Sequence, residues 1–172
     1  MITRRAFIGA ALTAAGGTLT ACSSVDADAA SSGAQTKPQF EITKTEDEWK
    51  RLLAPERFRV LRRHVTEPPG SSPLDREHRR GTYFCAGCDL PLFSSTAKFD
   101  SGTGWPSFTA PLENAVGTSI DRSYFAIRTE VHCRRCGGHL GHVFGDGPRP
   151  TGMRYCMNGL ALVFRPDTTT DR

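Results

Sequence analysis

The sequence is short of hydrophobic runs. Its apolar stretch at residues 6–21 is rich in alanine and glycine, and it is shorter than the roughly 20 residues that a transmembrane helix needs. The twin arginines Arg4 and Arg5 precede this stretch, as in export signals of the twin-arginine type. We therefore interpret residues 1–22 as a signal segment and exclude them from the fold.

The signal segment ends in the sequence LTAC at residues 19–22, which resembles a bacterial lipobox. This resemblance implies that Cys22 becomes a lipidated N-terminal residue, which would tether the protein to a membrane without spanning it. An ordinary signal peptide cut nearby and an unprocessed tail are the alternatives. We expect export by the twin-arginine route and a lipid-anchored location in the cell envelope, on a periplasmic or extracytoplasmic face.

The sequence also lacks a strong excess of charge. It has 22 Lys and Arg against 18 Asp and Glu, and removal of Arg4 and Arg5 with the signal segment leaves 20 against 18. The net charge then falls from +4 to +2. So small an excess gives no support for a nucleic-acid partner. Internal repeats are lacking as well, apart from two short CxxC pairs.

The remaining sequence predicts one folded domain at residues 40–165. Residues 23–39 are rich in small polar residues without apolar periodicity, so we expect a flexible linker, and residues 166–172 are expected to form a loose tail. A T-x-x-E capping pattern at Thr45 and a proline at position 55 predict two short helices. Seventeen glycines, eleven prolines and short apolar runs such as Leu160–Phe164 predict a mainly antiparallel β core behind them.

Four of the six cysteines form two CxxC pairs with 44 residues between them: Cys85, Cys88, Cys133 and Cys136. Two such turns can supply four thiolates to a tetrahedral Zn²⁺, which leaves no open position and predicts a structural ion. Gly87 and Gly137 are expected to give these turns their permissive backbone. Two disulfides are the alternative in an exported protein, although a CxxC disulfide closes a very small loop and is usually reactive.

Cys156 has no CxxC partner. A lone cysteine is usually a small hydrophobic residue, but the neighbours of this one favour a reactive thiol. Arg154 would stabilise a thiolate, and Asn158 offers a hydrogen-bonding amide. In an extended segment all three side chains project to the same side, which predicts a cation, a nucleophile and an amide in one row.

A second group of polar residues lies at His139, His142 and Asp146. They could bind a metal, but the zinc already has its ligands and a second ion would lack an obvious third. Histidines near a thiol more naturally donate and accept protons, with a purely structural role as the alternative, above all for His139. Trp105 lies in a glycine-rich loop, a composition in which functional residues concentrate.

Three segments together resemble a known family: EWKRLLAPERFRVLR, GTYFCAGCDLPLFSSTAKFDSGTGWPSF and RTEVHCRRCGGHLGHVFGDGPRPTGMRYCMNG. They are similar to the type B methionine sulfoxide reductases, which reduce the R epimer of methionine sulfoxide, free or within proteins. The resemblance covers about Glu48–Phe164. It implies a compact β fold of two antiparallel sheets with a few helices, and it places the zinc ligands of the family on the four paired cysteines.

The resemblance also assigns roles at the site. It implies that Cys156 is the nucleophile, assisted by Arg154 and Asn158, and that its product is a sulfenic acid. His142 is expected to protonate the sulfoxide oxygen, with His139 and Asp146 organising its protonation and hydrogen bonds. Trp105 is expected to form an apolar wall for the S-methyl group.

The sequence departs from many family members at Thr103, where they carry a resolving cysteine. We therefore expect an external thiol, from a thioredoxin-like or other envelope reductant, to regenerate Cys156. Recruitment of Cys22 or of a zinc cysteine is the alternative. A zinc-dependent binding module, the rival class, explains the paired cysteines but leaves Cys156, the histidines and Trp105 without a role. A catalytic zinc hydrolase is a third option, which the all-cysteine site disfavours.

Overall fold

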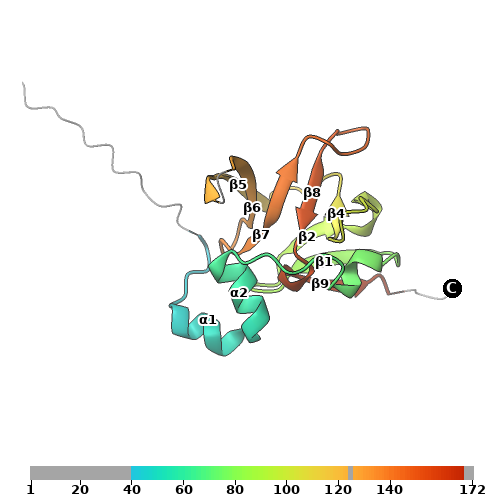
Figure 1. Ribbon diagram of the computed structural model, residues 1–172. Helices are drawn as coiled ribbons and strands as arrows, with labels where there is room; N and C mark the ends of the chain where they lie inside the picture. The colour runs from blue at the N-terminus through green and yellow to red at the C-terminus, as the bar shows by residue number, and fades with distance from the viewer. Residues whose placement is uncertain (1–39, 124–125, 169–172) are drawn as a thin grey trace, which may run out of the picture. The chain divides into compact units, whose positions relative to one another are not determined.

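The computed structural model describes residues 40–123 and 126–168 (Figure 1). The expected signal segment and linker lie outside these residues, as do residues 124, 125 and 169–172. In the described part of the chain, no helix has the length and apolar character that crossing a bilayer requires.

Two short helices open the described domain. Helix α1 (Glu46–Leu52) begins with the predicted capping box, in which Thr45 and Glu48 bond each other's backbone N–H. Helix α2 (Pro55–Arg63) begins with proline at a position where the missing N–H costs nothing, and it buries Phe58, Val60 and Leu61. It ends at His64, which has a left-handed conformation (φ 55°).

The rest of the domain consists of two antiparallel sheets. The smaller sheet has the order β2 (Pro91–Ser94), β1 (Gly81–Cys85) and β9 (Leu162–Pro166). The larger has the order β3 (Lys98–Phe99), β4 (Ser107–Phe108), β8 (Arg154–Met157), β7 (His139–Phe144), β6 (Arg128–Cys133) and β5 (Val116–Asp121). Short 3₁₀ turns lie at Pro73–Arg76, Ser95–Ala97 and Gly159–Ala161. The prediction of a mainly β fold with two antiparallel sheets is confirmed.

Aromatic side chains join the two sheets. Phe93 of β2 stacks on Phe108 of β4 with ring centroids 4.4 Å apart, and Tyr83 of β1 meets Phe108 edge-on at 4.9 Å. All three side chains are fully buried. Truncation of one such ring to alanine costs about 3–5 kcal/mol, so this cluster is a major source of stability.

The predicted strand at Leu160–Phe164 begins later than expected. Residues 159–161 form the 3₁₀ turn η4, and β9 starts only at Leu162. The reason lies elsewhere in the sequence: the buried carboxylate of Glu67 accepts the backbone N–H groups of Gly159 and Leu160 and holds the turn. Apolar composition alone could not reveal this contact.

Candidate active site and metal centre

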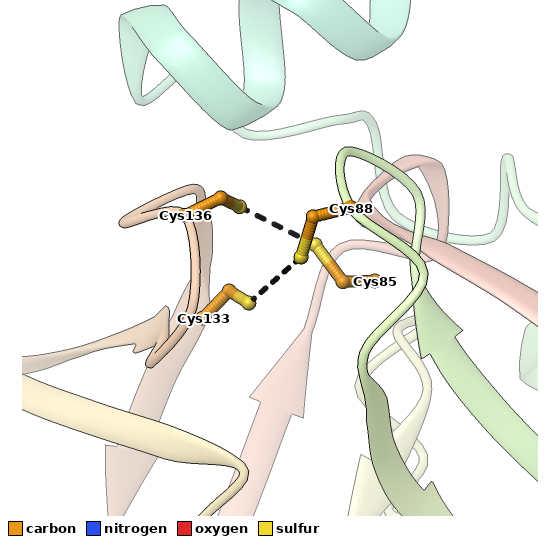
Figure 2. A group of neighbouring side chains, drawn as sticks. All are labelled: Cys85, Cys88, Cys133 and Cys136. Carbon is orange, nitrogen blue, oxygen red and sulfur yellow. Dashed lines mark hydrogen bonds between the residues drawn. The ribbon is translucent and has the colours of Figure 1, made fainter. Parts of the chain in front are cut away.

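The four paired cysteines converge between the two sheets (Figure 2). The turn Cys85–Cys88 follows β1 of the small sheet, and the turn Cys133–Cys136 joins β6 to β7 of the large one. The Sγ atoms of Cys85 and Cys136 lie 3.8 Å apart and those of Cys88 and Cys133 lie 3.5 Å apart. All four sulfur atoms lie within 4.8 Å of one another.

These distances fit a tetrahedral metal. Four sulfurs that each lie about 2.3 Å from a tetrahedral Zn²⁺ are about 3.8 Å apart. A disulfide requires about 2.05 Å, so the cysteines are free thiols. The four cysteines are thus positioned to bind a metal.

The two turns use different residues for the same backbone conformation. The N–H of Gly137 bonds the carbonyl of Cys133, and the N–H of Asp89 bonds the carbonyl of Cys85 in the equivalent way. Gly137 (φ 65°) and Asp89 (φ 61°) are both left-handed, whereas Gly87 is not. The expectation for Gly137 is therefore confirmed, while that for Gly87 is wrong: a Cβ there would make only ordinary contacts.

Cys156 lies in the middle of the large sheet. On β8 it is opposite Ser107 of β4 on one side and opposite His142 of β7 on the other. Directly opposed side chains in antiparallel strands have Cβ atoms about 4.5–5.5 Å apart. The register thus brings the predicted nucleophile and the predicted proton donor together. Gly141 permits this approach, because a Cβ at that position would collide with the carbonyl oxygen of Cys156.

Hydroxyl groups lie beside the Cys156 sulfur. Thr103 Oγ1 is 3.9 Å from Sγ and 2.8 Å from Ser101 Oγ, which lies 2.8 Å from Ser107 Oγ. Burial raises the pKa of the Cys156 thiol above its ordinary 9.0, and contacts with Thr103, Arg154 and Ser107 act in the opposite direction. The thiol is therefore mostly protonated at neutral pH, with the groups that favour its thiolate already in place.

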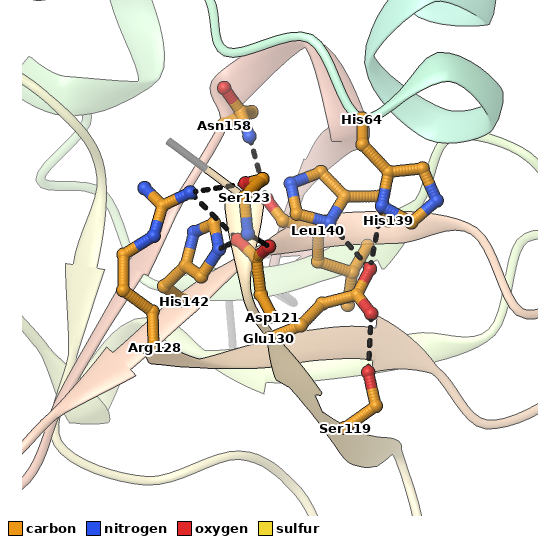
Figure 3. Close-up of polar contacts among 10 residues, drawn as sticks. All are labelled: His64, Ser119, Asp121, Ser123, Arg128, Glu130, His139, Leu140, His142 and Asn158. Carbon is orange, nitrogen blue, oxygen red and sulfur yellow. Dashed lines mark hydrogen bonds and ion pairs between the residues drawn. The ribbon is translucent and has the colours of Figure 1, made fainter. Parts of the chain in front are cut away.

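His142 is held by an acid that the sequence analysis did not identify. Its Nε2 lies 2.7 Å from Oδ2 of Asp121, at the end of β5 (Figure 3). Burial lowers the pKa of His142 below 6.5, although Asp121 opposes this shift. Hydrogen bonds from Ser123 and from His142 hold the pKa of Asp121 well below its usual range. A proton on Nε2 faces this carboxylate, so Nδ1 is the nitrogen that remains for the substrate side.

Asp146 does not contact either histidine. Its carboxylate receives a bidentate pair of hydrogen bonds from Arg154, with N–O distances of 2.9 and 2.8 Å. The Arg154 guanidinium also lies over the Phe144 ring, 4.4 Å from its centroid. We expected Asp146 to organise the hydrogen bonds of His142, but Asp121 takes that position. Asp146 instead orients the cation that stabilises a Cys156 thiolate.

Trp105 and Asn158 are fixed through one buried residue, Glu67, in the loop after α2. The Trp105 indole donates to the Glu67 carbonyl at 3.0 Å, and the Asn158 side-chain oxygen accepts the Glu67 N–H at 2.9 Å. The Asn158 amide also donates to the Leu140 carbonyl at 3.1 Å. Strand β8 ends at Met157, but Asn158 keeps an extended backbone (φ −65°, ψ 126°) at the N-cap position of η4. Asn158 lines the same cavity as Cys156.

These side chains surround a small cavity of about 130 Å³. Its walls include Cys156, His142, Trp105, Phe144 and Asn158. An aromatic ring on one side and a thiol with an imidazole on the other suit a small, partly apolar group that carries a polar oxygen. His139 does not line this cavity; its Nδ1 lies 2.7 Å from Oε1 of Glu130, and its ring meets His142 edge-on at 5.4 Å.

Four residues of this neighbourhood were not predicted from the sequence: Glu67, Asp121, Glu130 and His64. Each acts through a partner that is distant in the chain, and the partner is set by strand register or by the path of a loop. Of these four residues, only Glu130 has a signal in the sequence: it is an acid two residues after the start of a segment that otherwise has the pattern of a strand.

Comparison with known proteins gives a consistent result. The SelR domain model matches residues 53–166. A peptide methionine sulfoxide reductase MsrB of Bradyrhizobium diazoefficiens is 54% identical over 127 residues, which cover 73% of this chain and 91% of that protein. The MsrB proteins of Pseudomonas putida and Leptospira interrogans are 54% and 47% identical, and the matches cover 73% and 74% of this chain and 96% and 98% of theirs. The chain therefore belongs to the SelR-domain family of MsrB peptide methionine sulfoxide reductases.

Proposed function

We propose that this protein reduces methionine-R-sulfoxide, free or within proteins, to methionine, with Cys156 as the nucleophile. The observation that carries the proposal is the convergence of the Cys156 thiol, the His142 imidazole and the Trp105 indole on one small cavity. A binding module has no need of a thiol and a proton donor at the same cavity. A catalytic zinc hydrolase would need an open metal position, which four cysteine ligands do not leave.

The reaction transfers the sulfoxide oxygen to Cys156. The thiolate attacks the sulfoxide sulfur while a proton reaches the oxygen, because an unprotonated oxygen is a poor leaving group. This attack forms an S–S bond, and the S–O bond then breaks with its electron pair on the oxygen. The released hydroxide attacks Cys156 Sγ, and the S–S bond breaks with its electron pair on the methionine sulfur, which leaves methionine and a sulfenic acid on Cys156. Arg154 stabilises the thiolate electrostatically, and Asp146 holds Arg154 in position.

The proton comes from His142. A charged imidazole bonded to Asp121 through Nε2 presents its second N–H, on Nδ1, to the sulfoxide oxygen. Asp121 stabilises that charged form, because its own carboxylate stays ionised. His139, bonded to Glu130, packs against His142 and serves to position it.

Trp105 is the residue that selects the epimer. Its ring provides an apolar wall for the S-methyl group, and its indole N–H is already engaged by the Glu67 carbonyl, so the ring is fixed. With the oxygen directed to His142 and the sulfur to Cys156, only one arrangement of the remaining substituents places the methyl group on this wall. In the opposite epimer the methyl group and the methylene chain exchange places, so the longer chain would face this wall.

An external thiol completes the cycle. The neighbour of Cys156 in the loop at residues 101–105 is the Thr103 hydroxyl, which cannot condense with a sulfenic acid. Two thiol groups of a thioredoxin-like or other envelope reductant reduce the sulfenic acid, forming a disulfide and releasing water. We further propose that the four-cysteine cluster holds one structural Zn²⁺, because its sulfur spacing suits that ion.

We propose that the enzyme acts in the cell envelope, repairing oxidised proteins there. The twin arginines and the LTAC sequence at residues 19–22 support export and a lipid on Cys22. Membrane fractionation of the wild type and of Cys22→Ala tests the anchor: the wild type should stay with the membranes and the variant should be released.

The activity is tested with the R and S epimers separately, with dithiothreitol as reductant and chromatography of the methionine formed. The R epimer should be consumed and the S epimer left. Cys156→Ser should abolish turnover. Cys88→Ser should bind less metal, but it retains Cys156 as the nucleophile. Full activity of Cys156→Ser, or equal use of both epimers, would refute the proposal.

A further inference from the structure

A second cluster of side chains that could hold a metal ion includes His139, whose ring is next to that of His142 (Figure 3). His64 ends α2, Glu130 lies on β6 and His139 lies on β7. The Nδ1 atoms of His64 and His139 lie 3.1 and 2.7 Å from the same Glu130 oxygen. Each residue offers a ligand atom within 4.8 Å of the others. None of these residues belongs to the four-cysteine cluster.

The donor set suits a divalent transition metal. Two imidazoles and one carboxylate are ligands that Zn²⁺, Co²⁺ and Fe²⁺ accept. Burial acts to raise the pKa of Glu130, but hydrogen bonds from His139, His64 and Ser119 outweigh it, so this pKa lies well below its usual range. The acid is therefore an ionised carboxylate, as a ligand must be.

One atom of the cluster has no assigned role. His139 is only 2% exposed, and its Nε2 is buried without a hydrogen-bond partner among the described residues. This nitrogen is not one of the two that face Glu130, which are the Nδ1 atoms of His64 and His139. In the mechanism above, His139 uses only Nδ1.

Access to the cluster comes from a cavity of about 350 Å³ that His64, His139 and His142 line together. The His64 side chain is 59% exposed, so it can turn toward an arriving ion. The cavity leaves room for water as a further ligand. It also adjoins the substrate cavity, since Thr66, Arg128 and His142 line both.

We propose that His64, Glu130 and His139 form a second divalent-metal site, whose occupation inhibits the enzyme. The ion takes the place of the protons that the two rings share with Glu130, and these protons pass to solvent. Inhibition rests on the proposed function: an ion held by His139 lies in the cavity that His142 also lines, and His139, whose ring is 5.4 Å from that of His142, can then no longer position the proton donor in the same way.

Binding is tested on the full chain carrying Cys22→Ser and Cys156→Ser, which removes the thiols outside the four-cysteine cluster. After the first equivalent of Zn²⁺ is bound, calorimetry should detect a second. Co²⁺ added to the zinc-loaded protein should give the weak ligand-field bands of nitrogen and oxygen ligands, without sulfur-to-metal charge transfer. A single equivalent overall, or charge-transfer bands for the second ion, would overturn the site.

Three substitutions in that background locate the second ion. His64→Asn removes a ligand and keeps a residue that tolerates the left-handed backbone, and Glu130→Gln removes the anionic ligand. Each of these two substitutions should lower the affinity for the second Zn²⁺ at least about tenfold. His78→Asn changes an exposed histidine outside the cluster and should leave it intact. If Glu130→Gln does not fold, His64→Asn decides the question: unchanged affinity in that variant contradicts the proposal.

The effect on activity is measured in the chain with Cys156 intact, as the ratio of rates with and without added Zn²⁺. His64→Asn should raise the inhibitory zinc concentration at least about tenfold relative to His78→Asn. Equal inhibition of both variants would refute inhibition through this cluster and point to the Cys156 thiol as the inhibitory site. Metal binding without any reductase activity would instead contradict the proposed function and leave the site standing.

Discussion

Asp121 and His142 are joined by a 2.7 Å contact between Oδ2 and Nε2, across the pair of strands that flank β6. His142 is in turn directly opposite Cys156 on the next strand. A carboxylate, an imidazole and a thiol thus lie in series across the large sheet, and the pH behaviour of the reaction follows from this order.

The rate of sulfoxide reduction should be nearly independent of pH over a broad range. The pKa of His142 is lowered below 6.5 and that of Cys156 is raised above 9.0, so the reactive pair of thiolate and imidazolium is a minor form. Its population is constant between the two pKa values. Below the pKa of His142 the thiolate fraction falls with pH, and above the pKa of Cys156 the imidazolium fraction falls.

This profile is measured as kcat/KM for one turnover without reductant, so that ionisation of the reductant does not enter. A flat region that extends from about pH 6.5 to about pH 9 is expected from the ordinary pKa values of the two groups. A narrow optimum inside that range would show that the two pKa values lie close together and are not shifted apart.

Asp121→Asn should slow the reaction about tenfold or more and move the acidic limb of the profile to lower pH. The carboxylate raises the pKa of His142 against the effect of burial, and its loss makes the reactive imidazolium rarer. Asp146→Asn is the matched control, because Asp146 contacts Arg154 instead. If Asp146→Asn moved the acidic limb and Asp121→Asn did not, Asp146 and not Asp121 would be the acid that acts on His142.

Thr103→Val should make the Cys156 thiol less acidic. The hydroxyl lies 3.9 Å from Sγ and favours the thiolate, so its loss raises the thiol pKa further. At a fixed pH near 7.5, alkylation of Cys156 by iodoacetamide should slow about two- to tenfold, because a change of that size corresponds to the free energy of one hydrogen bond. Thr103→Ser keeps the hydroxyl and should react like the wild type. Equal rates for all three proteins would show that the hydroxyl does not act on the thiol.

Thr103→Cys should create an internal route for regeneration. The Thr103 side chain is already near the Cys156 sulfur, and a disulfide needs only a small further approach, to about 2.05 Å. After one turnover without reductant, mass spectrometry of the variant should find the two residues linked. The wild type should instead retain a sulfenic acid, which dimedone, a reagent selective for sulfenic acids, traps. An internal disulfide in the wild type would contradict regeneration by an external thiol.

Removal of the metal from the four-cysteine cluster should lower the unfolding temperature sharply. The free energy of binding at a structural zinc site contributes to folding, and the sulfurs here come from both sheets. A chelator strong enough to take the ion, or Cys88→Ser, should therefore reduce stability by several kcal/mol. Calorimetry with and without bound metal measures the difference. An unfolding temperature that is the same in both states would argue against a structural role.

Local patterns predicted much of this molecule. The capping box at Thr45, the proline start of α2 and the two CxxC turns are each set by residues a few positions apart, and each is confirmed. The assignment of roles to Cys156, Arg154 and the histidines came from the family resemblance and stays a prediction for the experiments above.

The carboxylates could not be predicted in the same way. Asp121 reaches His142 only because β5, β6 and β7 pair in one register, and Glu130 reaches two histidines from different elements. Asp146 is four residues from His142 in the sequence, which made it the more obvious partner. In β structure, however, contacts run across strands, so proximity along the chain is a poor guide to which acid meets which base.

The four-cysteine cluster makes the protein itself sensitive to oxidants. The turn that follows β1 of the small sheet meets the β6–β7 turn of the large one through the four sulfur atoms and a hydrogen bond from Arg135 to the Cys88 carbonyl. Oxidation of these thiols to disulfides within each CxxC pair would remove the ligands that a metal ion needs and weaken that junction. The same oxidants that create the substrate can therefore disrupt the fold that positions Cys156. A protein that reduces oxidised sulfur thus depends on four reduced cysteines for its own structure.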